Sequence, residues 1–361
     1  MAGKFEWKPF SQINIADHFF DTLKLDYPEF ENTWFPKGIT ENREALVFSD
    51  EAGLGAFVAL KRECEPIVMR EKNLPACPRL KISTLRLAER FRGQRLGEGA
   101  LGLVLWEWQK SEAQEIYLTV FAEHDDVIRQ VKRFGFLQEG TNERGELVFV
   151  RSRKNIDFSD PYKSFPFVAP YFRKGGYLIV EDGYHDTLFP YSELQHVLQE
   201  QLDRDAANGV SKVYIGQQWR SPHYQIGEPV FIYRKYTGRD GTPRYKSCVT
   251  SFCVVTDVVA VKRNYRYMMS FDQFCEVVGN KSVFSDRDLR EKYYKNRNVM
   301  VIKMLYCGYF GPGNNKNMDW LQKNNLWTKA DEYPAEIRLS PEQCVRIWSA
   351  SGADVEKITG R

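Results

Sequence analysis

The stretch Leu80-Lys81-Ile82-Ser83-Thr84-Leu85-Arg86-Leu87 alternates apolar and polar residues, a pattern that predicts a β-strand. It is followed by Arg92-Gly93-Gln94-Arg95-Leu96-Gly97-Glu98-Gly99, a turn rich in glycine and arginine. Residues 98–113 then carry apolar side chains at helical spacing. A strand, a glycine-rich turn and a helix in this order place backbone N–H groups at a helix N-terminus, where they can bind a phosphate.

The residues of this turn suit an approaching anion. Gly93, Gly97 and Gly99 remove side chains from its path, and Arg92 and Arg95 add positive charge. Many helices begin near glycine, so the alternative is a strand-to-helix turn that binds nothing. The segments around the turn are needed to decide between the two.

Downstream of the turn, the pattern continues as strand, helix and hairpin. Residues 115–122 are rich in β-branched and aromatic side chains, which favour a strand. Asp125 and Asp126 stand where a helix N-cap is expected, before a helix at residues 127–134. Residues 136–150 predict a hairpin. A mixed α/β arrangement follows from this order.

Upstream of the turn, the pattern predicts two short helices and a hairpin. Residues 15–25 and 29–34 have apolar side chains at helical spacing, and Phe35-Pro36-Lys37-Gly38 is expected to end the second helix. Residues 44–60 predict a hairpin with a turn near Gly53.

Three of these segments resemble the GNAT family of acetyl-CoA-dependent N-acetyltransferases. Gln94-x-x-Gly97-x-Gly99 matches the family signature Q/R-x-x-G-x-G/A, and residues 115–122 and Arg133-Phe134-Gly135-Phe136 follow the family pattern. The resemblance implies an α/β (α+β) fold with a splayed mixed sheet over residues 1–152.

The resemblance also implies how acetyl-CoA, the acetyl donor, would be bound. The sheet would open between strands 80–88 and 115–122, and main-chain groups of Leu85 and Leu87 would face the pantetheine arm. His124 stands at a position that the family often gives to asparagine and is counted with the cofactor residues. The acetyl group would pass directly to the acceptor, with no metal. The pyrophosphate would be bound by Arg92, Gly93, Gln94, Arg95, Leu96, Gly97, Glu98 and Gly99.

Acetyl transfer needs a neutral amine, so some group must accept the proton of the acceptor. The tyrosine that many family members use is replaced here by Val131, which has no titratable group. The candidate catalytic residues are Glu89 and His124, at strand ends beside the expected opening, and Tyr117, within a strand. For Glu89 the alternative is a surface carboxylate paired with a nearby arginine, and for His124 it is a helix-cap residue.

The composition is that of a soluble globular protein. The 361 residues carry a net charge of +3, with 43% hydrophobic and 27% charged residues. No apolar run approaches the roughly 20 residues that cross a bilayer, so no membrane partner is expected. The seven cysteines, without Cys-x-x-Cys spacing, predict no disulfide framework and a reduced, cytoplasmic setting.

The second half of the chain differs from the first in its residue composition and pattern. Residues 153–176 are rich in proline, glycine and aromatic side chains and predict a packed linker. Residues 177–361 carry short β-branched strands with short helices between them, which predicts a small, partly open β-barrel domain. The order of segments 214–215, 227–234 and 250–255 resembles PUA-like barrels of the EVE and ASCH type. Members of that superfamily bind RNA or modified bases, which the resemblance implies here.

Basic residues alternate with aromatic ones in several segments of this half, most clearly in Lys262-Arg263-Asn264-Tyr265-Arg266-Tyr267. Cations attract phosphates, and aromatic rings stack on unpaired bases. We therefore predict nucleic-acid contacts by Arg263 and Arg266, with Trp219 and Tyr233 in a base-stacking pocket. The alternative is a set of solvated loops with half-buried tyrosines.

Together these patterns predict an acetyl-CoA-dependent N-acetyltransferase with an RNA-type or RNA-associated substrate. The acceptor would be an amine of an RNA base, of aminoacyl-tRNA or of a ribosome-associated protein, presented by the second domain. Because some GNAT proteins that acetylate charged tRNA are toxins, a toxin with a neutralising antitoxin partner is a further expectation. One alternative is an acetyltransferase for a protein or a small amine, with a regulatory or oligomerising barrel. The other is a non-catalytic protein that binds CoA and nucleic acid.

Overall fold

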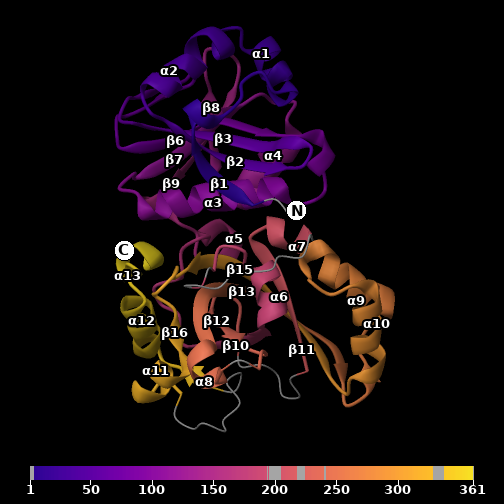
Figure 1. The fold of residues 1–361 in the computed structure, drawn as a ribbon. Helices are drawn as coiled ribbons and strands as arrows, with labels where there is room; N and C mark the ends of the chain where they lie inside the picture. The colour runs from indigo at the N-terminus through magenta and orange to yellow at the C-terminus, as the bar shows by residue number, and fades with distance from the viewer. Residues whose placement is uncertain are drawn as a thin grey trace. The chain divides into compact units, whose positions relative to one another are not determined.

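The computed structural model describes residues 4–192, 194, 205–217, 224–239, 241–327 and 337–360. The chain divides into two compact units, Met1–Ile156 (unit 1) and Asp157–Arg361 (unit 2). Each unit has a large β-sheet of its own, and Figure 1 shows these sheets with their helices. The prediction of a mixed α/β chain built on mixed sheets is confirmed.

The main sheet of unit 1 has seven strands, and its two central neighbours, β6 and β7, are parallel while the other described pairs are antiparallel. A small separate pair is formed by β4 (Ile67–Val68) and β5 (Asn73–Leu74). Across the main sheet the order is β1 (Phe5–Pro9), β2 (Glu44–Asp50), β3 (Gly53–Glu63), β6 (Arg79–Leu87), β7 (Glu115–Val120), β9 (Leu147–Ser152) and β8 (Leu137–Thr141).

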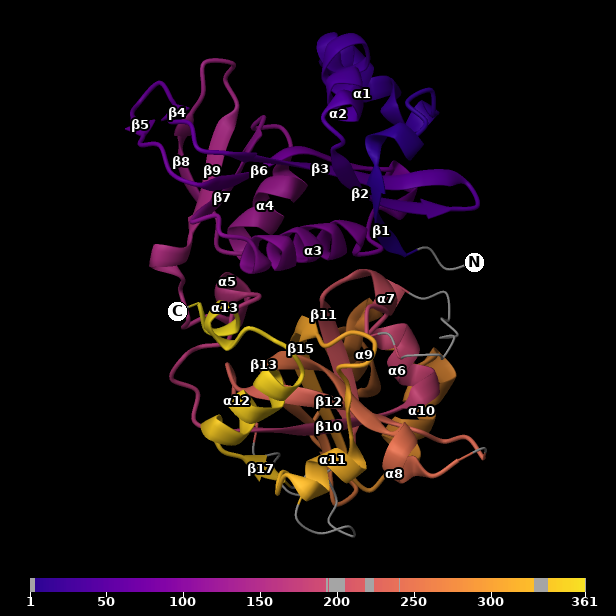
Figure 2. The ribbon, with the colours of Figure 1, turned by 60° about the vertical axis from the view of Figure 1, so that its left-hand side comes forward.

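Helices cover both faces of this sheet. In Figure 2, α3 (Leu96–Lys110) runs along one face, while α1 (Asp21–Asp26) and α2 (Phe35–Thr40) lie on the opposite side. On the α1–α2 side the core is a cluster of buried aromatic rings that includes Phe20, Phe35 and Phe57. The aromatic residues near the N-terminus therefore form core in large part.

One boundary differs from the sequence prediction. Phe35-Pro36 was expected to end a helix, but the π-helical turn Phe30–Trp34 continues directly into α2, with Pro36 in the first turn of α2. Proline is tolerated there because the first N–H groups of a helix have no partner within it. Pro36 therefore opens a helix instead of closing one.

The C-terminal end of α3 is held by a residue from the segment that was expected to be a linker. The guanidinium of Arg153 donates to the carbonyl oxygens of Gln109 at 3.1 Å and Ser111 at 2.8 Å, and also to that of Trp108. A cation is stabilising at this end of a helix, where unsatisfied carbonyls carry partial negative charge. Arg153 thus fixes the direction of α3, and α3 carries the glycine-rich turn at its other end.

Unit 2 contains an eight-stranded sheet in which β10 and β12 are parallel. Two short strands, β14 (Arg266–Tyr267) and β16 (Lys316–Asn317), pair with the long central strand β13. The pairings among the described strands leave the sheet open. The main order is β11 (Ser211–Gly216), β15 (Val299–Tyr309), β13 (Cys248–Arg263), β12 (Pro229–Lys235), β10 (Gly175–Glu181) and β17 (Arg338–Leu339).

Short helices surround this sheet. Two of the short helices expected between the strands are α9 (Phe271–Val278) and α10 (Asp286–Lys295), and each starts with a serine capping box. The helix expected at 192–206 falls largely outside the described residues. No described helix has the length and hydropathy of a membrane span. The others are α5 (Pro161–Ser164), α6 (Asp182–Leu188), α7 (Asp205–Asn208), α8 (Pro243–Lys246), α11 (Met318–Lys323), α12 (Pro341–Ala350) and α13 (Val355–Thr359).

Candidate acyl-donor and acceptor site

The two central strands of unit 1 are paired at their N-terminal ends only. Their parallel register runs from Arg79 opposite Glu115 to Ile82 opposite Leu118 and then stops. Strand β6 nevertheless continues to Leu87, and β7 continues beyond Leu118. The sheet is therefore open between the C-terminal halves of β6 and β7.

The opening starts at a β-bulge. On its other side, β6 pairs with β3, where Leu60 faces Ile82 and Ala59 faces Thr84, so that Ser83 is an extra residue. The hydroxyl of Ser83 donates to the carbonyl oxygen of Ala59 at 3.0 Å and holds the bulge in place. A bulge bends its strand and increases the local twist, which accounts for the separation of β6 from β7 at this point.

The main chain of β6 beyond the bulge offers hydrogen-bonding groups to the opening. The N–H of Ala88 donates to the carbonyl oxygen of Gly55 on β3 at 2.8 Å. Because main-chain groups alternate between the two edges of a strand, those of Leu85 and Leu87 point away from β3. These two residues therefore lie along the open edge of β6.

The glycine-rich turn lies at the wide end of the opening. Arg95 has a φ of 62° and immediately precedes α3, whose first residue is Leu96. Its guanidinium pairs with Glu98 at 2.9 Å, and both side chains are largely buried. Arg92 is exposed and pairs with Asp126 of α4 (Asp125–Arg133) at 3.4 Å. The cation most accessible to an anion is therefore Arg92, while the charge of Arg95 is balanced by Glu98.

Gly97 allows three elements to meet at the start of α3. A Cβ atom at this position would lie 2.8 Å from Leu87 Cδ1 of β6 and 3.3 Å from Gln130 Oε1 of α4. The side-chain nitrogen of Gln130 is buried without a hydrogen-bond partner among the described residues. Sequence reasoning did not find Gln130, because α4 carried no motif at that position.

The three residues predicted to be catalytic are not brought together. Glu89 is exposed in a short 3-10 turn after β6, and His124 is exposed directly before α4. Tyr117 is buried in the paired half of β7. Across the described part of the chain, no hydrogen bond or ion pair joins any two of them.

Tyr117 is instead bound to a residue that sequence reasoning missed. Its hydroxyl donates to a carboxylate oxygen of Glu63 at the end of β3, and burial together with this bond raises the pKa of Tyr117. Although burial raises the pKa of Glu63, hydrogen bonds from Lys61, at 2.8 Å, and from Tyr117 bring it below its ordinary value. Glu63 is therefore ionised at neutral pH, beside a phenol that can donate to it.

This pair lies on the face of the sheet that carries α1 and α2. Lys61, Lys81 and Tyr117 are register partners across β3, β6 and β7, so their side chains share one face. Tyr27, between α1 and α2, hydrogen-bonds to Glu146 just before β9, and burial and Glu146 raise the pKa of Tyr27. The helices are thus tied to the β8–β9 hairpin on the face where the Glu63–Tyr117 pair lies.

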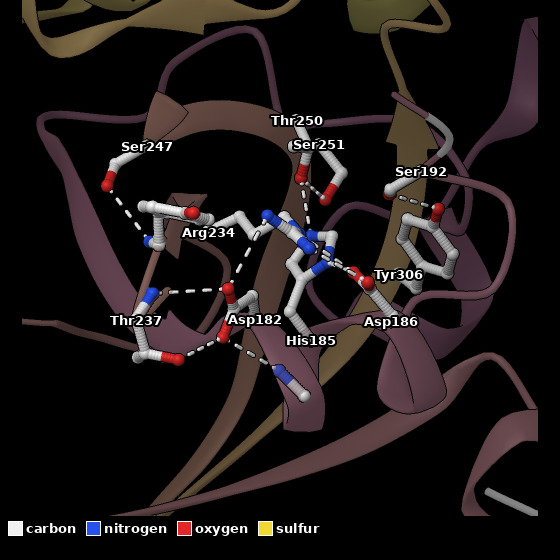
Figure 3. A network of polar contacts seen from close by, with 12 residues as sticks. Asp182, His185, Asp186, Ser192, Arg234, Thr237, Ser247, Thr250, Ser251 and Tyr306 are labelled. Carbon is white, nitrogen blue, oxygen red and sulfur yellow. Dashed lines mark hydrogen bonds and ion pairs between the residues drawn. The ribbon is translucent and has the colours of Figure 1, made fainter. Parts of the chain in front are cut away.

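Unit 2 contains a buried polar network, which Figure 3 shows. Nδ1 of His185 donates to Asp186 at 2.8 Å, and the hydroxyl of Thr250 bonds to Nε2 of His185 at 2.7 Å. Arg234 of β12 binds both oxygens of Asp186, at 2.8 and 2.9 Å. A hydroxyl–histidine–carboxylate chain can activate a nucleophile. Here all of these side chains are buried, so the network ties α6 to the sheet rather than facing a substrate.

The residues predicted to contact nucleic acid have different surroundings. Tyr233 is buried with its ring 5.2 Å from that of Trp327, and burial raises its pKa to about 12. Arg263 and Arg266 are exposed and face each other across the β13–β14 hairpin. Trp219 lies outside the described residues. The two arginines share a surface, whereas Tyr233 belongs to the core of unit 2.

No family model matches the chain, and no curated protein matches it. Among solved structures, it is similar to Arabidopsis thaliana Naa50 in complex with the bisubstrate analogue CoA-Ac-MVNAL, at 19% identity and a TM-score of 0.30, over 42% of this chain and 99% of that one. It is similar to ASCH from Zymomonas mobilis at 12% identity and a TM-score of 0.32, over 49% of this chain and 96% of that one. It is also similar to a mutant of the toxin AtaT bound to the C-terminus of the antitoxin AtaR, at 14% identity and a TM-score of 0.29, over 42% of this chain and 92% of that one.

Proposed function

We propose that this chain is an acetyl-CoA-dependent N-acetyltransferase that acts on an amine of an RNA-type or RNA-associated substrate. The observation that carries the proposal is the opening at Ser83, where β6 leaves β7 and presents the main chain of Leu85 and Leu87. An extended amide-containing arm can hydrogen-bond to such an edge in the manner of an added strand. The glycine-rich turn and the N-terminus of α3 then offer an anion site at its wide end.

The residues of this site supply hydrogen-bond donors for an anion. Gly97 leaves the start of α3 without a side chain, and the buried nitrogen of Gln130 is a donor without a partner among the described residues. We assign the pyrophosphate to the first turn of α3 with Arg92 and Gln130, and the pantetheine arm to Leu85 and Leu87. When bound, acetyl-CoA supplies an activated acyl thioester.

With the arm in this direction, we expect the reacting end near Tyr117 rather than near Glu89. The strand from Ser83 to Leu87 is about 13 Å long, and Glu89 follows it in the 3-10 turn. With the anion at the wide end, the acceptor amine is expected at the narrow end, next to Ile82 and Leu118. Tyr117 directly precedes Leu118, and its hydroxyl is bound to Glu63.

In the proposed reaction, the Glu63–Tyr117 pair accepts the proton of the amine. The Tyr117 oxygen takes the proton from nitrogen while the tyrosine proton passes to the Glu63 carboxylate. The raised pKa of Tyr117 makes a free tyrosinate costly, so the two transfers are coupled. Glu89 and His124, at the wide end, have no part in this step.

The exposed hairpin of unit 2 supports the RNA part of the proposal. Arg263, Arg266 and the tyrosines next to them are exposed on one hairpin of unit 2. These are residue types that bind phosphates and unpaired bases. The toxin role and the antitoxin partner stay predictions, since no described contact bears on them.

The proposal is tested by the transfer of labelled acetyl groups from acetyl-CoA to the RNA and protein fractions of a cell lysate. We expect label in the RNA fraction or in proteins that sediment with RNA. Glu63→Gln should lower this rate roughly 100- to 10,000-fold, while Glu89→Gln keeps it within a few-fold. If no fraction gains labelled acetyl groups, the proposed acetyltransferase activity is refuted. A loss with Glu89→Gln and none with Glu63→Gln would refute the assigned proton acceptor.

A further inference from the structure

The tip of the β13–β14 hairpin has an unusual backbone. Asn264 and Tyr265 have φ values of 46° and 64°, in the left-handed region. Two-residue hairpin turns of this kind favour asparagine followed by glycine, and a bulky side chain at the second position is strained. Burial of the Tyr265 side chain does not compensate for this backbone strain, because the residue is 63% exposed. Strain of this kind concentrates at functional positions, so the exposed ring of Tyr265 needs an explanation outside the fold.

The hairpin is held rigidly against the end of α10. The N–H of Tyr265 donates to the carbonyl oxygen of Arg297 at 2.9 Å, and the N–H of Asn264 donates to Asn298 Oδ1 at 2.8 Å. The buried ammonium of Lys262 donates to the carbonyl oxygen of Tyr293 at 2.9 Å. These three bonds fix the direction in which the tip presents its side chains.

Two further tyrosines near the tip are packed against other aromatic rings, and the ammonium of Lys262 lies over the ring of Tyr267, 4.4 Å from its centroid. The ring of Tyr267 stacks on that of Tyr293 at 4.8 Å, and the ring of Tyr294 stacks on that of Phe271 at 6.1 Å. Tyr267 and Tyr294 are nevertheless 46% and 55% exposed. Their inner faces are therefore immobilised while much of each ring remains accessible to solvent.

Positive charge surrounds these rings. Arg263 and Arg266 face each other across the hairpin, and the side chain of Arg266 makes no hydrogen bond or ion pair with any residue that the structure describes. In segments 262–267 and 290–297 the single carboxylate is Glu291, which pairs with Lys295 at 2.9 Å. The cations of the two segments are Lys262, Arg263, Arg266, Arg290, Lys292, Lys295 and Arg297.

We propose that this hairpin platform, formed by Arg263, Tyr265, Arg266, Tyr267 and Tyr294, binds a single-stranded segment of nucleic acid. Bases stack on the exposed tyrosine rings, and phosphates are bound by the arginines. A duplex hides the faces of its bases, so paired nucleic acid cannot use the rings. The inference deepens the proposed function and rests on it in one respect, the assignment of RNA as the biological ligand.

The test measures binding of the full-length chain to a fluorescein-labelled oligouridylate of about 12 nucleotides, a length typical of single-strand sites. Tyr265→Gly and Tyr265→Asn relieve the left-handed strain, so we expect both to melt at or above the wild-type temperature. One stacking contact corresponds to a roughly 5- to 150-fold loss of affinity, which both variants should show. The affinity then falls while the melting temperature does not, and a misfolded variant would lose both.

Tyr245→Ala is the matched control. Tyr245 is 60% exposed and lies between Arg244 and Lys246, but Arg244 is paired with Asp319 at 2.8 Å. This variant should bind within twofold of wild type. Arg266→Ala should lower the affinity and reduce the slope of log affinity against log salt by about 1.

Three results would overturn the platform: Tyr265→Gly binding as tightly as wild type, an unchanged salt slope for Arg266→Ala, or tighter binding of the duplex form of the oligonucleotide. Binding of an oligothymidylate is measured in parallel to compare DNA with RNA. Binding of either single strand supports the platform. The outcome is independent of acetyl transfer. If the oligonucleotide binding fails these tests while labelled acetyl groups still reach RNA, only this inference is refuted. If the oligonucleotide binds tightly while no fraction gains labelled acetyl groups, only the proposed enzyme activity is refuted.

Discussion

Gln130 carries a cost in stability that an occupied site would remove. Its side-chain nitrogen is buried without a partner among the described residues, beside Gly97 at the start of α3. An unsatisfied buried donor costs about 1–3 kcal/mol. If a phosphate oxygen of the cofactor accepts from this nitrogen, the cost is offset on binding.

Gln130→Leu should therefore stabilise the cofactor-free protein and weaken the cofactor complex. We expect the free energy of unfolding in urea to rise by about 1 kcal/mol and the affinity for acetyl-CoA to fall roughly tenfold. Gln138→Leu, at an exposed position of β8, is the matched control and should change neither quantity. A variant that loses stability and keeps its affinity would show that Gln130 serves the fold and not the cofactor.

Single residues were the least predictable level. Glu63 and Tyr117 are 54 positions apart in sequence and meet through strand pairing on either side of β6. Gln130 meets Gly97 through the packing of α4, which no local pattern records. The family resemblance, and no local pattern, is what suggested main-chain roles for Leu85 and Leu87, and these roles stay a prediction.

At the scale of elements, periodicity predicted β6, α3 and β7 well, because each is long and strongly patterned. Helix α6 was missed: its seven residues include a single aliphatic side chain, Leu188, and three of them, Asp182, His185 and Asp186, belong to the internal network. A short helix with its polar side chains inside shows no amphipathic pattern. What stabilises it is the contact with Arg234 and Thr250 from strands far away in sequence.

This network should make unit 2 sensitive to acid. Burial lowers the pKa of His185, against the opposing effect of Asp186, while Arg234 lowers it further. Although burial raises the pKa of Asp186, hydrogen bonds from Arg234 and His185 bring it below its ordinary value. The unfolded chain then binds more protons than the folded one below about pH 6.5, so stability falls as the pH falls through that value.

We expect the free energy of unfolding of wild type, from urea titrations, to fall by up to about 1.4 kcal/mol per pH unit below about pH 6.5 through His185. His185→Gln should be less stable near neutrality, because the bonds to Asp186 and Thr250 are altered, and should lose this part of the pH dependence. His18→Gln, at a fully exposed side chain, is the control and should keep the wild-type profile. An identical acid profile for wild type and His185→Gln would contradict the assignment.

At the scale of the molecule, each unit carries its own sheet, its own core and its own candidate site. The division of the chain into two folded parts was foreseeable from its length and from the change in texture after residue 152. The surface of unit 2 was foreseeable only in part. The basic and aromatic hairpin was marked by its sequence, but the burial of Tyr233 against Trp327 depends on tertiary packing.

The most direct test of the account is calorimetric titration of the full-length chain with acetyl-CoA, for wild type and Gly97→Glu. The new side chain would meet Leu87 and Gln130 and would place a negative charge where the pyrophosphate is expected. Leu137→Glu adds the same charge at a position that is 61% exposed on β8. We expect saturable binding by wild type and Leu137→Glu, and none by Gly97→Glu. Equal binding by all three proteins, or none by wild type, would contradict it.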